Sequence, residues 1–230
     1  MGNIFDVLWN KIYLTFIYQD RYLFFVEGLK NTLILTFGSF ILGTLFGILL
    51  CAMQRSENAI VQRVGKIIAT ALRGIPTMVL LMIMAYIIFG RSSLPLMLIV
   101  IVGLTMKAGS YLSEIFSAAL DTVESGEVEA ARTLGMDKWQ AFKNVVLPQT
   151  IKSAMPLYIN QFVASMQETS VVGYLAIVDL TKASSIVTSR TMDAFFGLIF
   201  ITIIYFVIGQ IAKHFVKKLE QSNLQEPAND

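Results

Sequence analysis

One polar stretch separates the apolar segments of this sequence: Glu129-Ala-Ala-Arg-Thr-Leu-Gly-Met-Asp-Lys-Trp-Gln-Ala-Phe-Lys-Asn-Val-Val-Leu-Pro148. Its spacing predicts a short helix over Val128 to Leu134. Gly135 is expected to close that helix, because glycine readily adopts the left-handed conformation found at many helix ends. Asp137 should then cap a second helix, since Gln140 follows three residues later in a variant of the capping box. We call residues 129–148 the elbow.

The second helix of the elbow carries an apolar stripe. Trp139, Phe142 and Val146 recur near helical spacing and should lie on one face. Pro148 has no backbone N–H for the helical ladder, so we expect it to redirect the chain. A compact pair of helices with charged flanks and an apolar face is typical of a surface that docks into a groove of another protein.

The elbow resembles the cytoplasmic coupling loop of binding-protein-dependent ABC importer permeases. The residues that carry the resemblance are Glu129, Ala130, Ala131, Gly135, Phe142, Leu147 and Pro148. An ordinary cytoplasmic hairpin with good caps would explain the two helices but not this full set. In the coupling interpretation, Gly135, Trp139 and Phe142 supply the docking shape. Glu129 and Arg132 fix the register.

Composition places the chain in a membrane. Charged residues make up 15% of it, against roughly a quarter in soluble domains, and the mean hydropathy is +0.65. The net charge of +2 is small and the basic residues are scattered along the chain, which argues against nucleic acid as a partner. Cys51 and His214 are the only residues of their kinds, so we expect no disulfide within the chain and no metal site. The sequence contains no phosphate-binding loop, so any ATP must bind to another subunit.

Apolar runs predict an all-α membrane protein with about five transmembrane helices. Spanning a bilayer takes about 20 apolar residues. The predicted spans are 29–53, 67–89, 94–120, a polar fourth span from near residue 153, and 193–212. Residues 173–191 are expected to form an external re-entrant or interfacial stretch. We expect an interfacial amphipathic segment at 1–28, a transmembrane domain at 29–218 with the coupling loop at 121–151, and a polar tail at 219–230.

The first two spans contain features that favour close packing or bending. Gly43 and Gly47 form a small-x-x-x-small pair that would let another helix approach. In the second span, Arg73, Gly74 and Pro76 predict a kink, and this run resembles Arg-Gly-Thr-Pro of amino-acid permeases. The kink could shape the pore wall or move during gating. Alternatively, Arg73 extends to the cytoplasmic interface beside an incidental kink.

The third span contains charges, which are costly in lipid and normally face a bundle interior or a wet cavity. Lys107 and Glu114 lie on nearly the same face but about 10 Å apart along the helix, too far for a direct ion pair. Each therefore needs another partner. With Tyr111, they resemble an Ala-Tyr-x-x-Glu-x-x-Arg run of amino-acid permeases, with Ser117 where Arg is usual. Glu114 could line a substrate pathway, or it could be a buried anchor between helices.

The fourth span is unusually polar. Gln161, Ser165 and Glu168 share a helical face, which should line protein or water rather than lipid. Glu168, Thr169 and Ser170 resemble a Lys-Asp/Glu-Thr-Ser-Leu run of the family, with Gln167 in place of Lys. The resulting negative site would suit the amino group of a substrate, or it could be a packed hydrogen-bond network. The predicted substrate pathway therefore comprises Lys107, Tyr111, Glu114, Gln161, Ser165, Glu168, Thr169 and Ser170.

The positive-inside rule orients the spans. With the N-terminus outside and the C-terminus inside, the cytoplasmic side holds eleven cationic residues: Arg55, Arg63, Lys66, Arg73, Arg132, Lys138, Lys143, Lys152, Lys213, Lys217 and Lys218. The outer side holds six: Lys11, Arg21, Lys30, Arg91, Lys182 and Arg190. This orientation puts the elbow in the cytoplasm.

The resemblance implies one transmembrane subunit of an ATP-driven ABC importer with the type I, MetI-like permease fold. It further implies transport of a polar amino acid by alternating access across a bacterial cytoplasmic membrane, as in histidine, arginine, glutamine and glutamate systems. The expected partners are a cytoplasmic ATPase dimer, a second identical or homologous permease subunit, an extracytoplasmic binding protein and membrane lipid. The chain itself would be no enzyme and hold no cofactor, because ATP and Mg would bind to the ATPase. Another small solute, or a channel or carrier outside the ABC class, remains the alternative.

Overall fold

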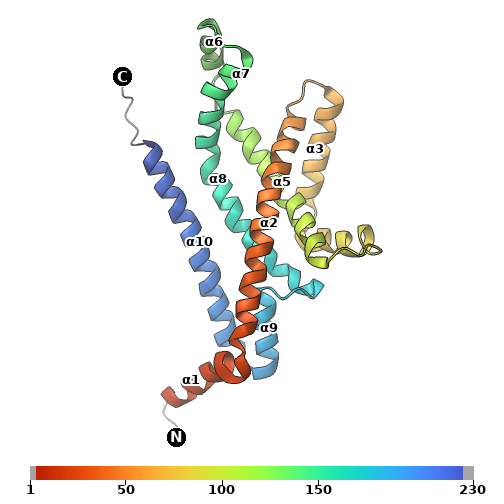
Figure 1. Cartoon of the computed structure of the whole chain (residues 1–230), viewed down its shortest axis with the longest axis vertical. Coiled ribbons are helices and arrows are strands. Elements are labelled where there is room, and N and C mark those ends of the chain that lie inside the picture. The colour runs from red at the N-terminus through yellow and green to blue at the C-terminus, as the bar shows by residue number, and fades with distance from the viewer. Residues whose placement is uncertain (1–3, 225–230) are drawn as a thin grey trace. The chain divides into compact units, whose positions relative to one another are not determined.

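The computed structural model describes the backbone of residues 4–224 and the side chains of 5–214, and this part of the chain contains helices and no strand. The helices are drawn in chain order in Figure 1. They are α1 (Ile4–Ile12), the π turn η1 (Tyr13–Ile17), the 3-10 turn η2 (Tyr18–Asp20), α2 (Tyr22–Gln54), α3 (Ala59–Gly74), α4 (Thr77–Met82), the π turn η3 (Ile83–Ile88), α5 (Leu96–Leu120), α6 (Ser125–Thr133), α7 (Lys138–Ala141), the π turn η4 (Phe142–Val146), α8 (Leu147–Glu168), the 3-10 turn η5 (Thr169–Leu175), α9 (Leu180–Thr191) and α10 (Phe195–Leu224).

The expected all-α membrane architecture is confirmed. Helices α2, α5 and α10 are long and apolar enough to cross a membrane. Two further spans are each broken into two pieces: α3 is followed by α4 and η3, and the helical run from α7 to η5 is followed by α9. Counting each broken pair as one span gives the predicted total of five.

The chain forms two compact units that share the long helices. Within the described residues, unit 1 contains 4–39, 76–104 and 164–210, and unit 2 contains 40–75, 105–163 and 211–224. Helices α2, α5, α8 and α10 each pass from one unit into the other.

The core of unit 1 contains a segment that the sequence had suggested was interfacial. Leu180, Ala183 and Val187 of α9 are fully buried and cluster with Phe25 and Ile201. The sequence analysis expected an external re-entrant or interfacial stretch over 173–191 and did not identify this buried helix, although a bent pair of this kind is compatible with a re-entrant segment. Its apolar residues recur at helical spacing, and Asp179 caps it by accepting hydrogen bonds from the backbone N–H groups of Thr181 and Lys182.

The first long helix begins earlier than predicted. Helix α2 starts at Tyr22 rather than Leu29, because Phe25 packs against Phe16 and Phe200 in unit 1 and extends the buried face. The left-handed backbone of Gln19 and Asp20 makes the corner that precedes it. The amphipathic segment predicted at 1–28 is therefore α1, two short turns and the start of α2.

Close packing in unit 2 follows from the predicted glycine pair. A Cβ atom added at Gly43 would lie 3.0 Å from the Cβ of Ala108, and one at Gly47 would lie 2.9 Å from the Cβ of Leu112. The expected close approach of a neighbouring helix is thus confirmed, and that helix is α5.

The last helix is longer than predicted. Helix α10 continues to Leu224, so the first residues of the predicted tail, 219–224, are helical. Residues 225–230 of the predicted tail lie outside the described part of the chain.

Candidate functional site

The first helix of the elbow closes as the sequence predicted. Helix α6 is followed by Gly135, whose φ of 91° is the left-handed conformation. Gly135 N donates to the Arg132 carbonyl at 3.1 Å, and Met136 N donates to the Ala131 carbonyl at 3.2 Å. These two bonds form a Schellman motif, which satisfies the last carbonyls of the helix.

The predicted capping box is also present. The Asp137 carboxylate accepts from Gln140 N at 2.8 Å, and the Gln140 side-chain carbonyl accepts from Asp137 N at 2.9 Å. Two orphan donors at the start of α7 are thereby satisfied. Residues a few positions apart therefore fix the end of α6 and the start of α7.

The prediction that Pro148 redirects the chain is wrong. Pro148 is the second residue of α8, and the helical run continues from Lys138 through it. The π turn over Phe142–Val146 precedes it, and Leu147 N donates to the Phe142 carbonyl to close that turn. Such a turn changes the hydrogen-bond register, so the donor that Pro148 lacks falls at the transition to α-helix and the run stays intact.

Figure 1 shows α6 and α7 together at one end of α8. The side chains of Leu134 and Trp139 are 82% and 68% exposed. Trp139 stacks on Phe142 with ring centroids 5.8 Å apart. Glu129, Ala130, Arg132, Leu147 and Pro148 are exposed, whereas Ala131 is buried. The elbow thus presents two large apolar side chains from a rigid frame.

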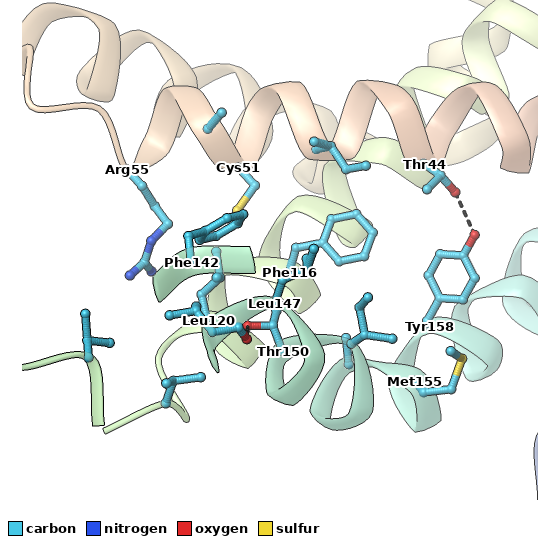
Figure 2. Close-up of a pocket in the computed structure, with 17 residues that line it drawn as sticks. Thr44, Cys51, Arg55, Phe116, Leu120, Phe142, Leu147, Thr150, Met155 and Tyr158 are labelled. Atoms are coloured by element: carbon cyan, nitrogen blue, oxygen red, sulfur yellow. Dashed lines mark hydrogen bonds between the residues drawn. The ribbon is translucent and has the colours of Figure 1, made fainter. Parts of the chain in front are cut away.

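An apolar cavity of about 920 Å³ lies inside unit 2, beside the elbow. It is lined by residues of α2, α5, α6, η4 and α8, and Figure 2 shows Phe142 near Cys51 at its wall. Thr44 and the Tyr158 hydroxyl form a 2.9 Å hydrogen bond at the wall of the cavity. Phe142 therefore connects the exposed Trp139 to the interior of its own subunit.

The charged residues of the third span meet the broken second span. The Lys107 ammonium donates to the carbonyls of Leu72, Arg73 and Ile75 at 3.1, 3.0 and 2.6 Å, and it lies 5.3 Å from the centre of the Tyr111 ring. Cations stabilise helix C-termini, because the last carbonyls there carry partial negative charge. Lys107 is thus a cap for the end of α3.

The break itself lies at Ile75 and Pro76. Both residues have extended backbone, with ψ of 128° and 137°, so α3 ends instead of bending. The expected kink at Arg73, Gly74 and Pro76 is therefore a full interruption, because Pro76 disfavours helical backbone at the residue before it.

Arg73 and Glu114 form an ion pair beside this break. Arg73 Nε lies 3.2 Å from the Glu114 carboxylate, and Arg73 also donates to the Ser110 carbonyl at 2.9 Å. Both charges that the sequence left without a partner therefore have one. Lys107, Tyr111 and Glu114 are brought together with Arg73, although whether they contact substrate stays a prediction.

The polar residues of the fourth span lie around the end of α8. Gln161 belongs to unit 2, and Ser165, Glu168, Thr169 and Ser170 belong to unit 1. Ser165 and Thr169 are buried, and the Thr169 hydroxyl donates to the Met166 carbonyl. Glu168 ends α8, and Thr169 and Ser170 begin the tighter turn η5. Their role in a substrate pathway stays a prediction.

One ion pair was missed by the sequence analysis. Arg55 at the end of α2 lies 2.7 Å from the Asp121 carboxylate and also donates to the Ser117 hydroxyl. Ser117 stands where the resembling permeases have Arg, and a guanidinium from another helix reaches this position. No pattern within one segment could have revealed that contact.

Comparison with known proteins agrees with this geometry. Residues 31–224 match the family described as "Binding-protein-dependent transport system inner membrane component". The "Probable amino-acid permease protein YxeN" of Bacillus subtilis is 28% identical over 80% of this chain and 84% of its own length. The "Probable amino-acid ABC transporter permease protein YckA" of the same species is 28% identical over 94% of this chain and 96% of its own length.

A solved structure, "Crystal structure of an amino acid ABC transporter with histidines", is 30% identical with a TM-score of 0.79. The aligned region covers 86% of this chain and 94% of the solved chain. The family match includes the elbow, the helix break, α5, α8, α10 and α2 from residue 31 onward. The chain therefore belongs to the family of inner membrane components of binding-protein-dependent transport systems.

Proposed function

We propose that this chain is a permease subunit of an ABC importer and that it carries a polar amino acid across the cytoplasmic membrane. The observation that supports it most is the elbow, in which Leu134 and Trp139 stand exposed on a frame held by a Schellman motif and a capping box. The relatives YxeN and YckA are named as amino-acid permeases, and the similar solved structure is named as an amino acid transporter.

The proposal includes partners that the chain needs for energy and substrate. A cytoplasmic ATPase dimer would bind ATP and Mg and would receive the exposed face of the elbow. This chain would then hydrolyse no ATP and hold no cofactor. A second permease subunit would complete the pore, and an extracytoplasmic binding protein would deliver the amino acid. The N-terminus would lie outside and the C-terminus inside, in agreement with the distribution of Lys and Arg.

The proposed mechanism is alternating access driven through the elbow. Closure of the ATPase dimer would move the elbow as a rigid body, because its bonds are local and its caps are complete. Phe142 would pass this movement inward through its contact with Trp139. The ATPase can shift the pore between two states only by binding one of them more tightly.

The test is purification of the intact complex with its partners, followed by reconstitution into lipid vesicles. L-glutamine, L-glutamate, L-histidine and L-arginine are each supplied with the binding protein. We expect at least one to stimulate ATP hydrolysis and to accumulate in the vesicles only when ATP is present. Accumulation without the ATPase, or stimulation by none of the four, would contradict the proposal.

Glu168 offers a second test within the same assay. Replacement by Gln removes the charge and keeps the size, so Glu168→Gln should slow uptake or change the preferred amino acid if the carboxylate faces the pathway. The matched control is Glu57→Gln, the same change at an exposed position in the loop between α2 and α3, which should leave uptake unchanged. Wild-type uptake kinetics in Glu168→Gln, with normal assembly, would assign Glu168 to packing.

A further inference from the structure

The end of α3 holds a cation that is fully satisfied by protein. An ammonium has three donors, and Lys107 donates to three carbonyls of the interrupted helix, at Leu72, Arg73 and Ile75. Its exposed fraction is only 3%. Lys107 is therefore poorly placed to meet a substrate carboxylate, and its contacts instead fix the backbone of Arg73.

The side chain of Arg73 is fixed by α5. Its guanidinium donates to the Ser110 carbonyl and pairs with Glu114, one turn further along α5. The Ser110 hydroxyl in turn donates to the Lys107 carbonyl at 2.7 Å, which closes the network. A guanidinium and a carboxylate are thus held side by side by bonds from two helices.

This ion pair is accessible, unlike Lys107. The Glu114 side chain is 64% exposed and that of Arg73 is 22% exposed. Both residues belong to spans, and a charged pair in a span faces a water-filled cavity or another protein and not lipid. Arg73 and Glu114 therefore lie on a side of α3 and α5 that faces water or another protein, where a solute in the pathway could reach them.

We propose that Arg73 and Glu114 form the contact for the α-carboxylate and α-ammonium groups of the transported amino acid, with Lys107 as the positioning residue behind them. The proposal rests on the function proposed above and names the part of the substrate that is recognised. A zwitterion can insert into the pair and leave every charge paired: its carboxylate meets the guanidinium, and its ammonium meets Glu114. Charge-assisted bonds of this kind are strong, and a guanidinium can hold a carboxylate through two of them.

The same unit contains a matched control. Arg55 and Asp121 also pair between two helices, at 2.7 Å, with side chains 40% and 65% exposed. Arg55 follows the last residue of α2 and Asp121 follows the last residue of α5, so both lie just outside the candidate spans. No cation is held behind Arg55 among the described contacts. Both pairs should tolerate reversal if their role is only to hold helices together.

The test uses the purified permease–ATPase complex without binding protein and measures binding of the radiolabelled amino acid that the intact system transports. Glu114→Gln and Arg73→Gln should each weaken binding by about tenfold to a hundredfold, the usual effect of losing a hydrogen bond to a charged group. The reversed pair, Arg73→Glu with Glu114→Arg, should assemble but bind no better than the single variants. The reversed control, Arg55→Asp with Asp121→Arg, should bind as the wild type does.

Chemical variants of the substrate address the same contact. The N-acetyl derivative and the methyl ester of the amino acid each remove one main-chain charge, so neither should compete with the free amino acid. Wild-type affinity in the reversed Arg73–Glu114 pair, or equal competition by both derivatives, would overturn the assignment. If the wild-type system instead transports no amino acid, the proposed function itself fails and the assignment fails with it.

Lys107 is tested by its coupling to the pair. Lys107→Met should weaken binding in the same direction as Arg73→Gln, because Arg73 loses its fixed backbone. When Lys107→Met is added to Glu114→Gln, the extra loss of affinity should be much smaller than the loss caused by Lys107→Met alone, since the effects of mutations within one network are not additive. Wild-type affinity in Lys107→Met, or a fully additive loss in the double variant, would remove Lys107 from the site.

Discussion

The elbow and the helix break after α3 are both specialised interruptions of a membrane helix bundle, but they are built in opposite ways. The bonds that form the turns and caps of the elbow join residues at most five positions apart, such as Met136 and Ala131, and one longer bond from Gln149 to Glu127 joins α8 to α6. The bonds that shape the break join residues 32 to 37 positions apart, from Lys107 and Arg73. The elbow can therefore keep its shape while it moves, whereas the break exists only while α3 and α5 stay together.

The elbow and the break also differ in which side chains they bury. The elbow exposes Leu134 and Trp139, which gives a partner something apolar to bind. The break buries Lys107 among carbonyls and exposes only the Arg73–Glu114 pair. One region is suited to contact with a protein, and the other to contact with a charged solute.

The largest expected effect is at Gly135. Its φ of 91° is strained for any residue with a Cβ, and most for a β-branched one, so Gly135→Val should disrupt the turn between α6 and α7. We expect loss of substrate-stimulated ATP hydrolysis with normal membrane insertion. Gly126→Val is the control, because Gly126 has ordinary helical backbone and open space around it. Normal coupling in Gly135→Val would show that the elbow is not the coupling element.

A smaller effect is expected on stability at the break. Lys107→Met keeps most of the side-chain volume but leaves buried carbonyls without their donor, which costs roughly 1–3 kcal/mol per unsatisfied group. The melting temperature of the purified complex should fall, whereas Lys66→Met, an exposed change on α3, should leave it unchanged. An unchanged melting temperature in both variants would mean that water replaces Lys107 as the donor to the carbonyls of α3. The break would then not depend on a buried cation, and it would not differ from the elbow in this respect.

The cap of α7 should contribute less. Asp137→Ala removes one acceptor at the helix start, a loss of about 1 kcal/mol. Hydrogen exchange of the Gln140 amide should become faster, and coupling should weaken without disappearing. Lys138→Ala is the control at the next exposed position. Equal exchange in the two variants would indicate that α7 is held by its partner rather than by its own cap.

The smallest effect is expected at a long-range pair near the N-terminal helix, in which the Lys11 side chain is 50% exposed and that of Asp193 is 17% exposed. Lys11 Nζ lies 2.8 Å from the Asp193 carboxylate, and together with a bond from Phe195 N it holds the pKa of Asp193 below the ordinary 3.8. Since the folded-state pKa is lowered, this contribution to stability is fully present above the ordinary value and is lost as the pH falls through the lowered one.

The measurement for this pair is proteolysis of α1 as a function of pH. Between neutral pH and the ordinary carboxyl pKa we expect constant protection, which should decrease in more acid solution. Asp193→Asn should remove that dependence, and it should affect the rest of the molecule little because the pair joins only α1 to the residue before α10. A steep loss of protection near neutral pH would point to another group.

The sequence predicted much of the elbow because its signals are local. The helix end at Gly135 and the capping box of Asp137 and Gln140 each depend on a few neighbouring residues, and both are present as predicted. The prediction that Pro148 redirects the chain failed because the π turn before it shifts the hydrogen-bond register. Such turns have no clear sequence signature. The pairs of Lys107 with α3 and of Arg55 with Ser117 needed two helices in contact, which no single segment reveals.

By itself the sequence determined that the chain is a helical membrane protein with a capped elbow, because apolar length, caps and turns depend on residues close together. Only the tertiary structure decided where the charges in and beside the spans go: Lys107 to a helix end, Arg73 to Glu114, and Arg55, just outside the spans, to Asp121. The physical reason is that a charge in a span must find a partner, and several were available in the sequence. Helix packing, set here by Gly43 and Gly47 against α5, brings one of them within reach.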